Sequence, residues 1–170
     1  MIVSLLMCTL SFEELLMACE KYLKKFLVIG AVSMGLAVSC GAIGAHAIKA
    51  DLQEKVAADE MTDVERFDVT HSWDTAVRLH GAHSLGLILI GLAAGSCSSR
   101  LRCWASGLLL AGIVLFSGMI YLYVALDLTT GRTISFLMLL VPIGGISWMA
   151  GWAVLACGFY HGPSAASQLD

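Results

Sequence analysis

Two long stretches of the chain carry no charged side chain, and this pattern decides the class of protein. One stretch runs from about Trp104 to Leu126, and the other from about Thr133 to Tyr160. Each exceeds the roughly 20 residues that a helix needs to cross a hydrocarbon core about 30 Å thick. A helix of a soluble domain normally keeps one polar face, which neither stretch has. The chain is therefore predicted to be an integral membrane protein.

Two further apolar segments raise the number of predicted spans to four. Residues 26–48 contain no charge, and residues 75–95 are apolar apart from a few polar side chains in the first turns. We predict an all-α fold, a membrane-embedded bundle of four transmembrane helices over residues 26–160, with a short tail at 161–170. The predicted spans are 26–48, 75–95, 104–126 and 134–160.

Residues 1–25 are predicted to form an N-terminal extension with an amphipathic helix that lies on the membrane surface. Ser11 and Glu14 have the spacing of a capping box. Apolar residues then recur at helical spacing, and charged residues take the other face. The apolar set is Phe12, Leu15, Leu16, Cys19, Leu23 and Phe26. The alternative is an unordered extension. The apolar stretch 1–10 has no basic region and is followed by no cleavage motif, so no signal peptide is expected.

Residues 49–74 are the only long polar segment, and we predict a solvated acidic loop. Thr62 and Glu65 have the spacing of a helix start within it. Eight acidic residues lie here, against Lys49, Lys55 and Arg66. They are Asp51, Glu54, Asp59, Glu60, Asp63, Glu65, Asp68 and Asp74.

Small residues predict where the helices touch. Glycine and alanine spaced by four allow two helix backbones to approach closely, and proline bends a helix. The predicted packing positions are Ala37, Gly41 and Ala45 in the first span, Gly91 and Gly95 in the second, and Pro142, Gly144 and Gly145 in the fourth. Trp148 and Trp152, four residues apart, are expected to pack or to face lipid.

Composition agrees with a membrane protein and excludes some partners. The chain is 58% hydrophobic and 14% charged, with a mean hydropathy of +0.83, whereas soluble domains carry about 25% charged residues. A net charge of −3 without a basic patch argues against a nucleic-acid partner. Six cysteines without a CxxC pair predict no disulfide framework.

The orientation follows from lysine and arginine near the spans. With the N-terminus on the cytoplasmic or matrix side, that side holds five basic residues: Lys21, Lys24, Lys25, Arg100 and Arg102. The other side holds Lys49, Lys55, Arg66 and Arg132, three of them in the long loop, where they count for less. We therefore expect both termini on the cytoplasmic or matrix side.

Four ionisable residues at membrane depth are the candidates for chemistry. His46, Arg78, His80 and His83 all approach the same side in this topology, and burial of such groups in a membrane is costly. If the first two spans are neighbours, the three imidazoles could converge to bind a metal or haem or to relay protons. The alternatives are interhelical hydrogen bonding, which Ser117 and Tyr121 could join, and an Arg78 that extends to the interface.

The main motifs of nucleotide-binding and hydrolytic enzymes are absent from the sequence. There is no GxGxxG, GxxxxGK[ST], HExxH or GxSxG, and no span holds paired carboxylates. We expect no enzymatic activity and no cofactor.

Four segments in order resemble the domain-of-unknown-function 423 family, which includes transmembrane protein 256 of eukaryotes. The first is GAIGAHA at 41–47, and the second runs from Thr75-Ala76-Val77 to His83. The third runs from LFSG at 115–118 to Tyr121, and the fourth from PIGG at 142–145 to AGW at 150–152.

The resemblance implies a small four-helix protein of the bacterial inner membrane or the mitochondrial inner membrane, and it supplies no activity. His46 and His83 match the family motif, whereas the family often has another polar residue at His80. Residues 1–25 are additional to the usual family sequence, and the segment 49–74 is longer than usual.

Two hypotheses of function follow. The first is a non-catalytic accessory or assembly subunit in the lipid bilayer, which packs through its small-residue faces against another membrane protein or a second copy of itself. The second is a small-molecule, metal or haem-binding membrane protein that uses His46 and His83, with His80 as a third candidate.

Overall fold

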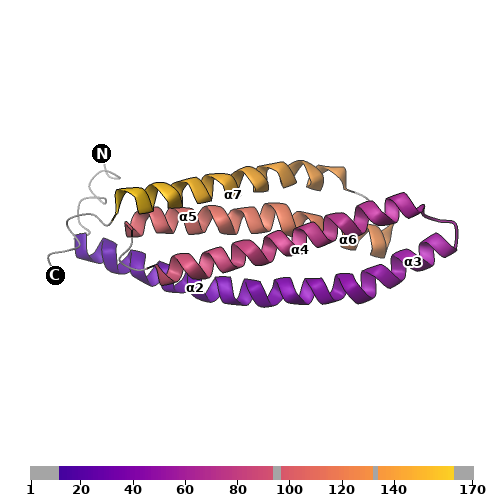
Figure 1. Cartoon of the computed structure of the whole chain (residues 1–170), viewed down its shortest axis with the longest axis horizontal. Helices are drawn as coiled ribbons and strands as arrows, with labels where there is room; N and C mark the ends of the chain where they lie inside the picture. The colour runs from indigo at the N-terminus through magenta and orange to yellow at the C-terminus, as the bar shows by residue number, and fades with distance from the viewer. Residues whose placement is uncertain (1–11, 94–96, 132–133, 163–170) are drawn as a thin grey trace, which may run out of the picture.

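The chain folds into four long helices that lie side by side, as the computed structural model shows (Figure 1). The structure describes the backbone of residues 12–93, 97–131 and 134–162, and the side chains of these ranges except 12–23 and 99. Within these ranges there is no strand, and four helices are long and apolar enough to cross a membrane. The predicted all-α membrane fold is therefore confirmed.

Two of the four long helices are interrupted by π-helical turns. The first consists of α2 (Phe12–Ile43), the π turn η1 (Gly44–Ile48) and α3 (Lys49–Ala57). The second is α4 (Asp63–Leu92). The third consists of α5 (Ser99–Gly112), the π turn η2 (Ile113–Gly118) and α6 (Met119–Thr130), and the fourth is α7 (Ser135–His161). A π turn adds one residue to a helical turn, and such turns occur often at functional sites.

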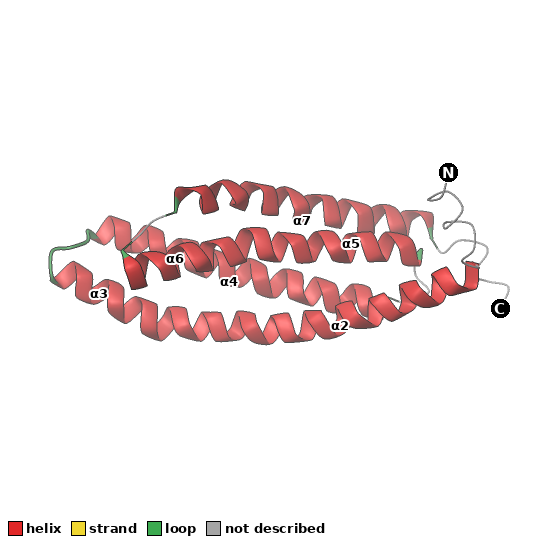
Figure 2. Cartoon of the chain, turned by 180° about the vertical axis from the view of Figure 1, so that it is seen from behind, coloured by secondary structure: helices red, strands yellow, loops and turns green. Residues whose placement is uncertain are grey.

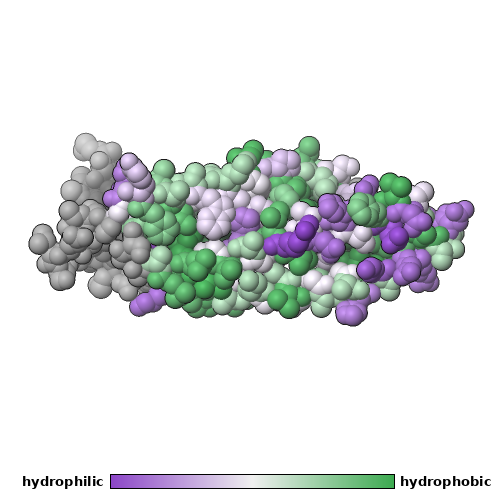
Figure 3. Space-filling view, viewed as in Figure 1, coloured by the Kyte–Doolittle hydropathy of each residue, from purple (hydrophilic) through white to green (hydrophobic). Residues whose placement is uncertain are grey.

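The two ends of the bundle differ in polarity. The end where α3 meets α4, called here the α3–α4 end, is strongly hydrophilic (Figure 3). At the opposite end, called the α4–α5 end, α2 begins and α7 ends (Figures 1 and 2). At 30 residues and about 1.5 Å per residue, α4 is about 45 Å long, longer than a hydrocarbon core of about 30 Å.

The polar segment 49–74 differs from the predicted loop because most of it is helical. Helix α3 continues the first span, and α4 starts at Asp63, so a short turn replaces the loop. Leu52 on α3 is completely buried in an apolar cluster with Trp73, which explains why the helix continues beyond the membrane.

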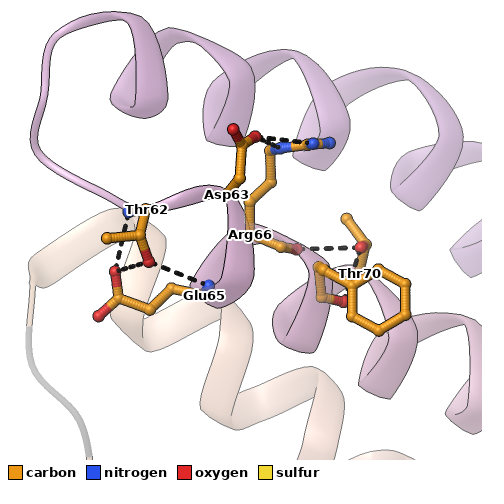
Figure 4. Close-up of polar contacts among 6 residues, drawn as sticks. Thr62, Asp63, Glu65, Arg66 and Thr70 are labelled. Atoms are coloured by element: carbon orange, nitrogen blue, oxygen red, sulfur yellow. Dashed lines mark hydrogen bonds and ion pairs between the residues drawn. The ribbon is translucent and has the colours of Figure 1, made fainter.

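The start of α4 is fixed by a capping box, as the Thr62 and Glu65 spacing predicted (Figure 4). The Glu65 amide donates to Thr62 Oγ1 at 3.3 Å, and the Thr62 amide donates to Glu65 Oε2 at 2.9 Å. The Thr62 amide and hydroxyl both donate to Glu65 Oε2, and these two bonds hold the pKa of the exposed Glu65 carboxyl below its usual value. Arg66 adds a salt bridge to Asp63 at 3.0 Å.

The N-terminal region also differs from the predicted arrangement. The structure places residues 12–25 in a helix, as expected, but this helix runs into the first span without a break. A separate helix in the membrane plane is therefore not formed by residues 12–25. Ser11 of the predicted capping box lies outside the described residues.

Helices α2 and α4 pack through small residues spaced by seven. A side-chain carbon at Gly30 would lie 2.9 Å from the Ser84 carbonyl oxygen, Ala37 is 2% exposed, and Gly44 accommodates the Trp73 ring. The predicted row of Ala37, Gly41 and Ala45 is only partly correct. Ala45 is exposed, because steps of four residues rotate by about 40° each and leave the seam.

Helices α5 and α7 use a second small-residue seam. Gly112 accommodates the Trp148 ring, Gly144 lies against the backbone of Phe116, and Gly151 lies against Leu109. Of the predicted packing positions in α7, Gly144 makes a close contact, Gly145 makes only ordinary contact, and Pro142 is exposed. In the second span Gly91 packs against Leu27, and Gly95 lies outside the described residues.

Gly30→Ala should destabilise the bundle, whereas Gly35→Ala should not. The added methyl at Gly30 would meet the Ser84 carbonyl and the Leu87 side chain, and overpacking typically costs about 1–3 kcal/mol. At Gly35 of the same helix there is nothing within 4 Å of the new carbon, so the variant is the matched control. Unfolding of the two purified variants in detergent measures the difference, and equal stabilities would contradict this packing.

Candidate functional site

A layer of hydrogen-bonded polar side chains crosses the interior of the bundle. It consists of Ser33 on α2, His80 and Ser84 on α4, Ser117 in η2 and Tyr121 on α6. We call it the polar layer. On α4 it lies between two apolar clusters, one containing Trp73 and Ala76 and the other Leu87 and Ile90.

His80 is the centre of the polar layer and has a partner for each ring nitrogen. Its Nε2 lies 2.9 Å from Ser33 Oγ, and its Nδ1 lies 3.3 Å from the Tyr121 hydroxyl. Ser84 extends the chain by donating to Ser33 Oγ at 2.8 Å. A hydroxyl both donates and accepts, so either neutral tautomer of His80 finds partners here. The imidazole is 6% exposed, and these bonds offset the cost of burial.

Bonds to backbone carbonyls tie the polar layer to the helices around it. Ser117 Oγ donates to the Ala76 carbonyl at 2.9 Å, and Trp73 Nε1 donates to the Cys40 carbonyl at 3.0 Å. The expectation that Ser117 and Tyr121 take part in interhelical hydrogen bonding is confirmed.

His83 lies in a different environment, stacked on an aromatic ring of α7. Its imidazole is nearly parallel to Trp148, with ring centroids 3.9 Å apart, and Trp152 lies at 6.0 Å. His83 Nδ1 is 2.7 Å from the Leu79 carbonyl oxygen. A carbonyl only accepts, so Nδ1 carries the proton in this geometry. Trp148 Nε1 in turn donates to the Leu109 carbonyl at 3.1 Å.

The structure does not bring the predicted site residues together. His46 is exposed on η1, and no hydrogen bond or ring contact joins it to His83. His46 lies two residues beyond Gly44, which faces α4, so its side chain points away from that helix. His83 is also ten residues, or about 15 Å, along α4 from Trp73, the residue that Gly44 contacts. Arg78 is also exposed, and its guanidinium bonds to Thr75 at 3.3 Å. In the described ranges no three His, Cys, Asp or Glu side chains form a metal-binding group.

Sequence reasoning missed the role of three residues in these contacts. Ser33 and Ser84 were not singled out, because a lone serine in an apolar segment has no pattern of its own. Only Ser84 has a sequence pattern that could have pointed to it, because it follows His80 by four residues and so shares its helix face. Trp148 was predicted only to pack or face lipid, whereas it stacks on His83 and is 4% exposed.

Four membrane-length helices around buried, internally bonded polar groups define a multi-pass helical membrane protein. The chain belongs to the family described as "Protein of unknown function (DUF423)", whose model matches residues 40–145. The match includes His46, His80 and His83 and both π turns, so the predicted family is confirmed.

Relatives with similar sequences are membrane proteins of bacteria. A UPF0382 membrane protein of Staphylococcus haemolyticus is 35% identical over 133 residues, which cover 78% of this chain and 93% of that protein. The UPF0382 membrane protein YwdK of Bacillus subtilis is 32% identical over 134 residues, which cover 78% and 94%. No solved structure gives a significant match. The family carries no assigned activity, and nothing in these comparisons indicates catalysis.

Trp148→Phe should destabilise the bundle by about 1–3 kcal/mol, because it removes both the indole hydrogen bond to Leu109 and the part of the ring that packs against Gly112. Trp104→Phe is the matched control, since Trp104 is 66% exposed and surface changes are usually within about 0.5 kcal/mol. Chemical unfolding in detergent measures both. A Trp148→Phe protein as stable as the control would show that the buried bond and the ring contact contribute little.

Proposed function

We propose that this chain is a non-catalytic accessory subunit that binds another protein of the same membrane through the outer face of α2. The observation that supports the proposal is a second row of small residues on this helix. Ala31, Gly35, Ser39 and Ala42 are exposed, and they lie opposite the face that packs on α4. No described atom lies within 4 Å of a side-chain carbon placed at Gly35.

Large exposed side chains such as Val32 and Val38 flank the row on α2, and the row between them is what differs from α7. The exposed face of α7 carries large side chains, such as Phe136, Leu139 and Ile146, which suit contact with lipid. Small residues at helical spacing instead allow another helix to approach closely, which lipid chains do not require. The Ser39 hydroxyl donates to the Gly35 carbonyl at 3.0 Å, so the row offers a neutral surface. Its occupant is therefore an uncharged transmembrane helix.

The contacts of the two buried histidines also support a non-catalytic role. His80 has partners on both ring nitrogens, and His83 is held by Leu79 and Trp148. Both imidazoles therefore stabilise the bundle, and neither has a carboxylate or a thiol among these partners. The proposal places the protein in the bacterial inner membrane, in keeping with its bacterial relatives.

A photo-crosslinking amino acid at position 35 should link this chain to one other membrane protein in native membranes. The crosslinked product should be a single species, heavier than the monomer and different in mass from a dimer of this chain. The same amino acid at Met149, exposed on α7, is the control and should give lipid adducts only. Ala42→Leu should abolish the adduct from position 35, because a bulky residue blocks close approach. An adduct with the mass of a dimer would identify a second copy as the occupant. Equal adducts from positions 35 and 149 would contradict a specific face.

The α3–α4 end should lie outside the membrane-enclosed compartment, with both termini inside. Lys24, Lys25, Arg100 and Arg102 gather at the α4–α5 end, and basic residues favour the cytoplasmic side. A Glu60→Cys substitution in a cysteine-free background should react with a membrane-impermeant maleimide in intact cells. Reaction only after the cells are opened would reverse the orientation.

A further inference from the structure

Two buried polar side chains at the α4–α5 end have atoms without a hydrogen-bond partner. Arg102 is 7% exposed, and its Nε has no acceptor. Ser106 is completely buried, and its Oγ has no partner. They are four residues apart and therefore lie on one face of α5. Unpaired donors in a buried site are costly, and more so when they are charged. Among the residues whose side chains the structure describes, none supplies an acceptor to either atom.

Arg102 extends toward the beginning of α5. Helical side chains point toward the N-terminus of their helix. Burial raises the pKa of the Cys97 thiol, and the positive charge of Arg102 acts to lower it, so the guanidinium is within electrostatic reach of the turn before α5. Ser98 at this helix start gives no side-chain hydrogen bond to the first amides. A guanidinium and the amides of a helix N-terminus both favour an anion.

The charge distribution favours a phosphate at this position. Every acidic side chain that the structure describes lies within residues 51–74 or at Asp127, near the α3–α4 end. Arg100, in the same turn as Arg102, is exposed and adds positive charge. A guanidinium matches the oxygens of a phosphate with two parallel hydrogen bonds. Phospholipid headgroups present phosphates at the end of a transmembrane helix, and basic pockets there bind anionic lipids.

We propose that the α4–α5 end holds a binding site for the phosphate of an anionic phospholipid, with the Arg102 guanidinium as the main contact and Ser106 as a second donor. The lipid supplies the missing acceptor and neutralises the buried charge. The site is distinct from the outer face of α2, so it does not depend on the proposed partner.

The full chain purified in a mild, lipid-free detergent tests the proposal. Phosphatidylglycerol should raise the midpoint of thermal unfolding, and phosphatidylcholine or inorganic phosphate at the same phosphate concentration should give a clearly smaller shift. The Arg102→Met variant should lose the phosphatidylglycerol shift. Arg100→Met is the matched control, because it removes one positive charge from an exposed position in the same turn, and it should keep the shift.

The thermal stability of the Arg102 variant without lipid shows whether a lost shift reflects lost lipid binding or a damaged fold. Arg102→Met removes an unpaired buried charge, so this variant should be at least as stable as the native chain before lipid is added. If the Arg102→Met protein cannot be purified, Arg102→Lys serves as the test variant. Lysine keeps the positive charge but not the paired donors of a guanidinium, so this variant should lose most of the phosphatidylglycerol shift. A full shift in either Arg102 variant would overturn the proposal. An equal shift with inorganic phosphate would overturn the assignment to lipid.

Discussion

Close approach of helix backbones at small residues is the constraint on which the structure depends. Gly30, Ala37 and Gly44 bring α2 against α4, and this distance lets the short side chain of Ser33 reach both Ser84 and His80. Lipid chains are as apolar as leucine, so helices in a bilayer gain little from burying apolar surface against each other. Close packing and internal hydrogen bonds must supply the association free energy instead.

The polar layer follows from this constraint because an unpaired polar group in hydrocarbon is costly. His80 is tolerated since α2 and α6 each bring it a hydroxyl. Its bonds also favour one register of the neighbouring helices, since sliding α2 or α6 along α4 would separate His80 from Ser33 or from Tyr121. We regard this selection of one register as the main role of the layer.

The sequence predicts the four spans and the family, because uncharged length and motif order are local properties. It does not predict which faces meet. The row of Ala37, Gly41 and Ala45 steps by four residues, whereas the seam alternates steps of three and four, as helices crossing at a shallow angle require. The same drift turns His46 away from α4, and His83 lies at the level of Gly30 and Ser33 rather than of His46. The long polar segment was predicted as a loop because buried Leu52 on α3 has no local signal.

The π turns connect the motifs of the family with its packing. GAIGAHA includes four of the five residues of η1, and LFSG includes four of the six residues of η2, so two of the four motif segments overlap places where a helix takes one extra residue. At η2 this brings Ser117 into reach of the Ala76 carbonyl, while Gly144 of α7 lies against the backbone of Phe116. At η1 it brings Gly44 under the Trp73 ring. The motifs are therefore explained by close helix contacts, and they need no catalytic role.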